Sequence, residues 1–264
     1  GRVDFTGAGN TLGINGTPYT PIKDVAALQD IDTNLTGRYA LANNIDATAT
    51  ASWDAGAGFR PIGEFNGALD GLGHVVNALS IDRPGGLGAG LFSQTLSGST
   101  VRNIGLAGGS IKGGLSTGGL IGSQQGGSIS NAYATATVSG DLFVGGLVGE
   151  QSGSIRNAYA TGGVSGNTGV GGLVGALQDD SIDNAYATGV VSGTVNIEGA
   201  GYTASGPVTV NPALILGQAR TASKNVGTYS VDLSSLYSTQ QGYDIRVDPT
   251  TAIYTVTPKA VTGS

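Results

Sequence analysis

Short apolar blocks bounded by glycine and serine recur along the middle of the chain at nearly constant spacing. A Gly-Gly-Leu-[Ile/Val]-Gly block is followed in each unit by Ser-Ile-x-Asn-Ala-Tyr-Ala-Thr and then by Val-Ser-Gly. The first block starts at residues 118, 145 and 171, the second at 128, 154 and 181, and the third at 138, 164 and 191. A period of roughly 20–50 residues indicates a repeat architecture, in which each unit buries its apolar face against its neighbours.

Three β-compatible blocks separated by glycine and serine are typical of one coil of a parallel β-helix. We therefore predict an all-β chain built around a right-handed parallel β-helix (solenoid) of about 26–28 residues per coil, with about three short strands in each coil. Stacked coils would pair each strand with its copies about 4.8 Å away, so that identical residues lie on top of one another. Leucine-rich repeats need a richer leucine frame, and propeller blades need roughly 40 residues, so both match less well.

An asparagine recurs at the same place in each second block and in weaker upstream copies. The expected ladder consists of Asn77, Asn103, Asn131, Asn157 and Asn184. Asparagine tolerates the left-handed backbone conformation, and its amide can hydrogen-bond to its copies along a stack of strands. We expect this column to be structural.

A second column follows from Tyr133, Tyr159 and Tyr186. Strict alternation along a strand places Ile129 and Tyr133 on one face, and the isoleucine must be buried. This parity favours a half-buried aromatic column that stabilises the stack. Facing outward, the same column would be a platform for binding sugar rings.

Changes in glycine content and in the pattern of apolar residues divide the chain into three parts. Residues 1–60 are expected to be a lead-in that caps the β-helix, with a short helix over 24–31 and a strand over 38–42. Residues 61–198 carry the coils. Residues 199–264 have less glycine and alternating strand patterns, which predict a small β module.

Composition narrows the functional classes. The chain has 264 residues, of which 48 are glycine, 11% are charged and none is cysteine, so disulfides and cysteine-based metal sites are excluded. The net charge of −6 gives no electrostatic basis for binding nucleic acid. No apolar run approaches about 18 residues, so we expect no membrane insertion.

Candidate catalytic and metal-binding groups are sparse. The single histidine, His74, lies in a glycine-rich turn, and we expect a turn residue with a satisfied ring rather than a catalytic base or zinc ligand. The densest acidic cluster, Asp179, Asp180 and Asp183, is a weak calcium candidate because no Asp-x-Asp-x-Asp-Gly loop is present. We expect no catalytic residue, no cofactor and no firm metal site.

The repeated unit resembles the GLUG repeat. The segments at residues 39–47, 59–63 and 69–74 resemble the region that precedes such repeats in filamentous-haemagglutinin-like exoproteins, and residues 225–259 are similar to their MBG-type β modules. The resemblance implies export by two-partner secretion through an outer-membrane transporter to the bacterial surface or extracellular matrix. No signal peptide is visible, and the amino-terminal secretion domain of these exoproteins has no counterpart here, so we expect an internal segment of a longer protein.

The function expected from this resemblance is adhesion. A rod with many serine, threonine and asparagine side chains suits weak multivalent contact with exopolysaccharide, cell-surface glycan or other copies of itself. The resemblance implies a non-enzymatic adhesin or biofilm-matrix segment. The alternatives are a β-helical polysaccharide lyase or hydrolase, which would need stacked carboxylates in one groove, and a spacer without a binding role.

Overall fold

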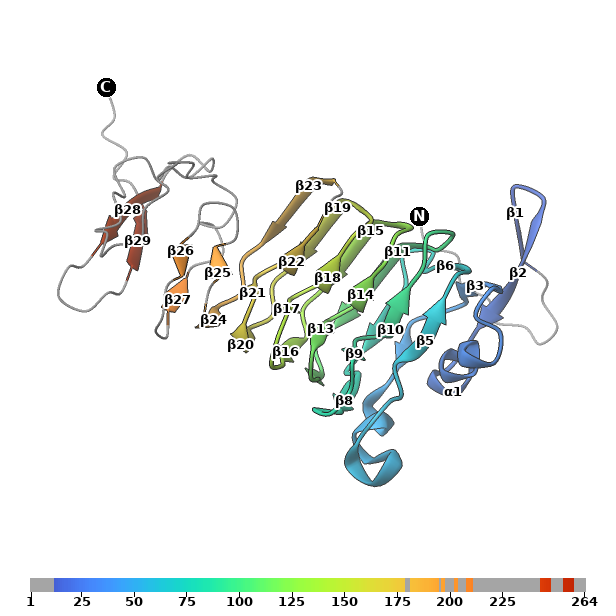
Figure 1. Ribbon diagram of the computed structural model, residues 1–264. Helices are drawn as coiled ribbons and strands as arrows, with labels where there is room; N and C mark the ends of the chain where they lie inside the picture. Colours follow the sequence, from blue (N-terminus) through green and yellow to red (C-terminus); the bar gives the residue numbers. More distant parts are fainter. Residues whose placement is uncertain are drawn as a thin grey trace.

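The computed structural model describes residues 12–178, 181–194, 196–197, 202–203, 208–210, 243–247 and 254–258, and side chains over 12–178 and 181–193. Within these residues the fold is an all-β parallel solenoid of about six turns with a single short α-helix near the N-terminus (Figure 1). The predicted parallel β-helix is therefore confirmed. The module expected over 199–264 lies largely outside the described residues.

Four parallel sheets run along the solenoid, numbered here in the order in which a coil visits them. The first contains β9 (Gly88–Ala89), β13 (Ser116–Gly118), β17 (Val144–Gly145) and β21 (Val170–Gly171). The second contains β5 (Ile62–Phe65), β10 (Phe92–Thr95), β14 (Ile121–Gln124), β18 (Val148–Gln151) and β22 (Val174–Leu177). The third is centred on β3 (Arg38–Leu41), β6 (Ala68–Asp70), β11 (Thr100–Ala107), β15 (Ser128–Ala134), β19 (Ser154–Ala160) and β23 (Ile182–Ala187). The fourth contains β8 (Ser80–Asp82), β12 (Ser110–Lys112), β16 (Thr137–Ser139), β20 (Val164–Thr168) and β24 (Val191–Thr194).

Each full coil thus has four strands rather than the expected three. The Gly-Gly-Leu-[Ile/Val]-Gly block is divided between the first and second sheets, with a corner at its second glycine and leucine. The two sheets approach so closely that only glycine fits. A Cβ on Gly145 would overlap the carbonyl oxygen of Val148, and one on Gly149 would lie 2.5 Å from the backbone nitrogen of Thr117. The glycines of the repeat therefore serve close backbone packing.

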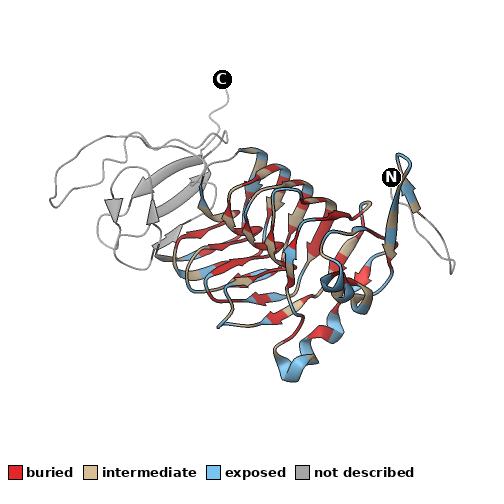
Figure 2. Ribbon diagram, turned by 45° about the vertical axis from the view of Figure 1, so that its right-hand side comes forward, coloured by how far each residue is buried: buried red, intermediate tan, exposed pale blue. Residues whose placement is uncertain are grey.

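Successive coils pair in register. Ile129 pairs with Ile155 and Ile155 with Ile182, while Tyr133 pairs with Tyr159 and Tyr159 with Tyr186. The aliphatic side chains of these columns fill the interior, and buried residues alternate with exposed ones along the coils (Figure 2). Burial of each column by its copies supplies the main driving force for stacking.

The asparagine in the third sheet changes the side-chain alternation. Asn103, Asn131, Asn157 and Asn184 have φ between 49° and 53°, in the left-handed region. In β15 the consequence is that Ile129, Ala132 and Ala134 are all buried, while Tyr133 is only half-buried and faces outward. The expected parity, with tyrosine on the isoleucine face, is therefore wrong, because it assumed extended backbone at Asn131.

Asn77 is not part of the asparagine ladder. It lies at the end of β7 (Val75–Asn77) and pairs with Ala107, whereas Asp70 is the residue that pairs with Arg102, next to Asn103. An additional turn at 71–74 separates β6 from β7, so that the spacing read from the sequence placed Asn77 in the wrong column.

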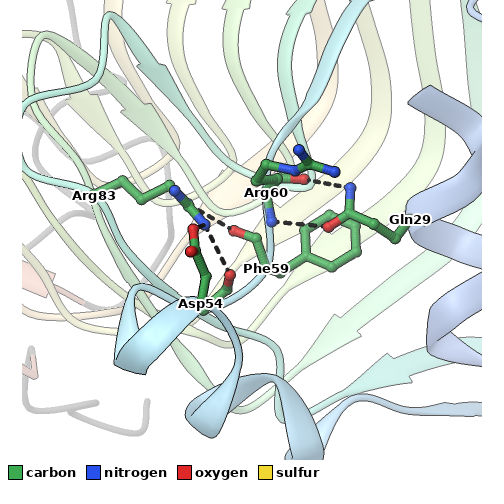
Figure 3. Close-up of polar contacts among 6 residues, drawn as sticks. Gln29, Asp54, Phe59, Arg60 and Arg83 are labelled. Carbon is green, nitrogen blue, oxygen red and sulfur yellow. Dashed lines mark hydrogen bonds and ion pairs between the residues drawn. The ribbon is translucent and has the colours of Figure 1, made fainter. Parts of the chain in front are cut away.

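The N-terminal end of the solenoid is covered. The hairpin of β1 (Leu12–Ile14) and β2 (Thr17–Ile22) pairs with β3, and Asp24 caps α1 (Val25–Gln29), which continues into a 3-10 turn, η1 (Asp30–Thr33). The Gln29 side chain both donates to and accepts from the backbone of Arg60, at 2.9 Å each (Figure 3). Asp32 accepts the backbone N–H of Gly63 at 2.9 Å. Asp32 thus satisfies one backbone group on the edge of β5, and Gln29 satisfies two in the segment just before it, at an edge that would otherwise be open for pairing.

Two 3-10 turns, η2 (Thr48–Ser52) and η3 (Asp54–Gly56), form a protruding loop after β4 (Ile45–Asp46). Arg83 ties this loop to the solenoid by bonding to Asp54 at 2.6 Å and to the carbonyl oxygens of Gly58 and Phe59 (Figure 3). Beyond the last full coil, β27 (Val208–Val210) pairs antiparallel with β24. Two further antiparallel pairs join β25 (Asn196–Ile197) to β26 (Tyr202–Thr203), and β28 (Tyr243–Val247) to β29 (Tyr254–Pro258).

Candidate ligand-binding face

The outer face of the third sheet carries a stack of tyrosine rings. The centroids of Tyr133 and Tyr159 are 4.9 Å apart with planes within 2°, and those of Tyr159 and Tyr186 are 5.3 Å apart with planes within 10°. These distances follow the strand spacing, because each ring comes from the same position in successive coils. Stacking of this kind leaves ring edges and hydroxyls exposed along the side of the column and ring faces only at its two ends.

Burial and mutual proximity perturb the middle ring. Desolvation raises the pKa of Tyr159 above its ordinary value, and the negative charges that Tyr133 and Tyr186 would carry when ionised raise it further. The Tyr159 hydroxyl therefore keeps its proton under physiological conditions, and the column offers weakly polar aromatic surface with hydroxyl groups.

The asparagine amides form a continuous hydrogen-bonded row beside the tyrosines. Asn184 donates to Asn157 at 2.7 Å, Asn157 to Asn131 at 3.1 Å, and Asn131 to Asn103 at 3.0 Å. All the amides therefore point the same way along the rod.

The row ends on a buried carboxylate. Asn103 donates to Asp70 Oδ1 at 2.9 Å, and Arg102 Nε bonds to Asp70 Oδ2 at 2.8 Å. The Asp70 side chain is only 4% exposed, and the backbone N–H of Leu72 is a further donor to it. Asp70 therefore has the multiple charge-assisted partners that a buried carboxylate requires.

A shallow hollow of about 410 Å³ lies at the Asp70 end of both columns. Its lining includes Leu72, Gly73, His74, Asn103, Gly105 and Tyr133. Its walls come from the turn at 71–74 and from the outward side of β11 and β15. A second, more open hollow of about 320 Å³ follows the Val-Ser-Gly blocks on the fourth sheet, where the lining side chains are Ser139, Ser165, Asn167 and Ser192.

His74 is fully buried, and its Nδ1 lies 3.4 Å from Asn44 Oδ1. Of the weak calcium candidates, Asp179 and Asp180 lie outside the described residues, and Asp183 is exposed on β23. Across the part of the chain that the structure describes, no three histidine, aspartate or glutamate side chains come together as a metal site. The same part contains no helix long and apolar enough to cross a membrane.

Asp70, Gly105 and the turn at 71–74 were not singled out as site residues by sequence reasoning. Leu72 and Gly73 line the hollow because an insertion between β6 and β7 interrupts the repeat, and Asp70 holds this turn without lining the hollow itself. The presence of glycine at the tyrosine position of one coil is the signal that could have located the end of the aromatic column.

The fold and the outer face define a parallel β-solenoid with a stacked aromatic column and an amide ladder. Residues 113–139, 144–165 and 166–196 match the GLUG motif. The chain is similar to halomucin of Haloquadratum walsbyi (strain DSM 16790 / HBSQ001), with 44% identity over 147 residues, which is 51% of this chain and 2% of that protein. The chain therefore spans only a small part of the length of this relative.

Solved structures give weaker similarities. A crystal structure described as a putative immunoglobulin A1 protease from Bacteroides ovatus aligns with a TM-score of 0.44 and 18% identity, covering 72% of this chain and 82% of that one. A structure described as an IgA1 protease aligns with a TM-score of 0.42 and 22% identity, covering 66% of this chain and 16% of that one.

Proposed function

We propose that this chain is a rod-like, non-catalytic segment of a large extracellular surface protein, and that the outer face of its third sheet binds polysaccharide. The observation that carries the proposal is the outward column of Tyr133, Tyr159 and Tyr186 beside a row of amides. Aromatic rings contribute apolar contact area, while amides and hydroxyls provide hydrogen bonds, and this combination suits a neutral, hydroxyl-rich ligand.

The repetition of the same groups in successive coils supports multivalent attachment. Each coil offers a weak contact, and several contacts to one polymer act together through their high effective concentration. The match to the GLUG motif and the similarity to halomucin support a place in a large surface protein. Export by two-partner secretion to a bacterial surface and an adhesin or biofilm-matrix role belong to the same proposal, as does attachment to other copies of the rod.

The proposal is tested by retention of the protein on immobilised polysaccharides, with neutral and acidic polymers compared. The triple variant Tyr133→Ala/Tyr159→Ala/Tyr186→Ala should lose retention on the polymer that holds the unaltered protein. The matched control, Ser139→Ala/Ser165→Ala/Ser192→Ala, alters the same three coils on the fourth sheet and should be retained normally. Circular dichroism before and after heating verifies that both variants fold.

Three outcomes contradict the proposal. Equal retention of the two triple variants would remove the tyrosine column from binding. Failure of the unaltered protein to bind any polymer would favour a spacer. Release of reducing ends or unsaturated products during incubation would reveal a lyase or hydrolase.

A further inference from the structure

The tyrosine column ends at Gly105. This glycine pairs with Tyr133 and occupies the position that tyrosine holds in the next three coils. The Tyr133 ring lies directly over it, since a Cβ on Gly105 would overlap Cζ of that ring. The stack therefore stops with Tyr133, whose side away from Tyr159 has no further ring against it.

The hollow begins where the next ring of the column would lie. Tyr133 and Gly105 form one side of it, and Leu72, Gly73 and His74 form the other. The volume of about 410 Å³ is within the range of roughly 300–1,000 Å³ that is usual for small-ligand sites.

The wall opposite Tyr133 is fixed in place by hydrogen bonds. Leu72 and Gly73 have φ of 51° and 82°, and the Leu72 N–H donates to Asp70 Oδ1 at 2.9 Å. The N–H of Gly73 donates to the carbonyl oxygen of Asn103, also at 2.9 Å. The left-handed turn is thus tied to β11, and the hollow is formed without a ligand, which lowers the entropic cost of binding.

We infer that this hollow binds one pyranose ring of a neutral polysaccharide, with a face of the sugar against the part of the half-buried Tyr133 ring that Gly105 leaves uncovered, and with its hydroxyls towards the amides of Asn103 and Asn131. Among the described residues, no aspartate, glutamate, lysine or arginine side chain lines it, and the nearby Asp70 is already paired with Arg102, so the site favours an uncharged ligand. A saturated ring with hydroxyls at its rim matches one aromatic wall and several polar groups. The inference rests on the proposed function and deepens it by locating the main contact at one end of the column.

Calorimetric titration with neutral tetrasaccharides (cellotetraose, maltotetraose and mannotetraose) and with an acidic alginate tetrasaccharide tests the inference. We expect one neutral sugar to bind, Tyr133→Ala to weaken its affinity at least tenfold, and Tyr133→Phe to preserve it. The comparison variant is Tyr186→Ala at the opposite end of the same column, whose loss of affinity for the tetrasaccharide should be much smaller than that of Tyr133→Ala. Saturation-transfer NMR should then show the strongest contact for the protons on one face of a single sugar ring.

A second variant keeps the test decisive if Tyr133→Ala fails to fold. Leu72→Arg introduces a long charged side chain on a half-buried position of the wall, without changing the core, and should abolish binding. Leu87→Arg, at a side chain that is 77% exposed and outside the hollow, is its control.

The outcomes separate this inference from the proposed function. Equal losses for Tyr133→Ala and Tyr186→Ala would overturn the hollow while leaving polysaccharide binding along the column. Unchanged affinity of the Leu72→Arg variant for the tetrasaccharide would likewise overturn the hollow as the binding site. If only the alginate tetrasaccharide binds tightly, the hollow is not a neutral sugar site. The same conclusion follows if no tetrasaccharide binds while the immobilised polymers still retain the protein. No retention by any polymer would contradict the proposed function itself.

Discussion

At the scale of single residues, the asparagine of each third-sheet strand determines which side chains face outward. Its left-handed conformation brings isoleucine and the following two alanines to the interior and turns the tyrosine between those alanines outward. Most residues are strained in this region, whereas asparagine tolerates it. The amide row then adds hydrogen bonds between coils that an alanine would lack.

Variants at Asn131 separate these two contributions. Asn131→Ala should lower the free energy of unfolding by about 2 kcal/mol, because the left-handed conformation costs a non-glycine residue roughly 1–2 kcal/mol and the amide bonds are lost as well. Asn131→Gly loses the same bonds without that strain and should cost about half as much, allowing for the greater freedom of glycine in the unfolded chain. Urea denaturation measures both, and equal losses would exclude backbone strain as a factor.

Thr117 offers a stabilising substitution. Its Oγ1 is buried without a hydrogen-bond partner, and the residues at its position in adjacent coils are Ala89 and Val144. Thr117→Val keeps the shape and removes an unsatisfied polar group, so the free energy of unfolding should rise by about 1 kcal/mol. Thr161→Val, at an exposed position, should have little effect in the same measurement.

The pKa shift of Tyr159 predicts a loss of stability at alkaline pH. Its pKa is raised in the folded chain, chiefly by burial, so the folded state holds the proton more tightly than the unfolded state, whose tyrosines ionise near pH 10. The resulting stabilisation is complete below about pH 10 and is lost as the pH rises through the folded pKa. Thermal melts should show a smaller alkaline decrease for Tyr159→Phe than for the unaltered protein, and identical pH profiles would contradict this.

At the scale of elements, the glycine block joins the first two sheets by backbone contact. Gly145→Ala should destabilise the chain by about 3 kcal/mol or prevent folding, because its Cβ would overlap the carbonyl oxygen of Val148 and rigid backbone cannot move aside. Gly85→Ala is the matched control, since nothing lies within 4 Å of a Cβ there. Comparable melting temperatures for the two variants would show that the sheets can separate at little cost.

The strand arrangement follows from the sequence only where the repeat is regular. Period, parallel stacking and the columns of Asn131, Asn157 and Asn184 could be predicted, because identical residues at fixed spacing must coincide in a solenoid. The fourth strand of each coil and the outward direction of Tyr133 could not be predicted, because both depend on local backbone geometry at glycine and asparagine. The hollow could not be predicted either, because the turn at 71–74 interrupts the repeat from which the register of β7 would have been read.

At the scale of the whole molecule, stability is a sum over coils and their interfaces. Deleting residues 145–170 removes one complete coil and joins Val144 to Gly171, which restores the original register because Val144 pairs with Val170. This variant should fold cooperatively, with a lower melting temperature, and should still bind through the hollow. Deleting 145–157 leaves half a coil and should not fold. Calorimetry and circular dichroism distinguish the two, and similar melts would contradict independent stacking of the coils.

The common orientation of the asparagine amides gives the row a net dipole along the axis of the rod. Their individual dipoles add, as peptide dipoles do in an α-helix. The NH₂ group of Asn103 is the positive end of the row, and the side-chain oxygen of Asn184 is the negative end. Asp70 sits at the positive end, where an anion is favoured, just as an acidic residue is at the start of a helix. A carboxylate therefore sets the polarity of the whole row, and its replacement by a neutral or donor-only group would leave successive amides free to reverse.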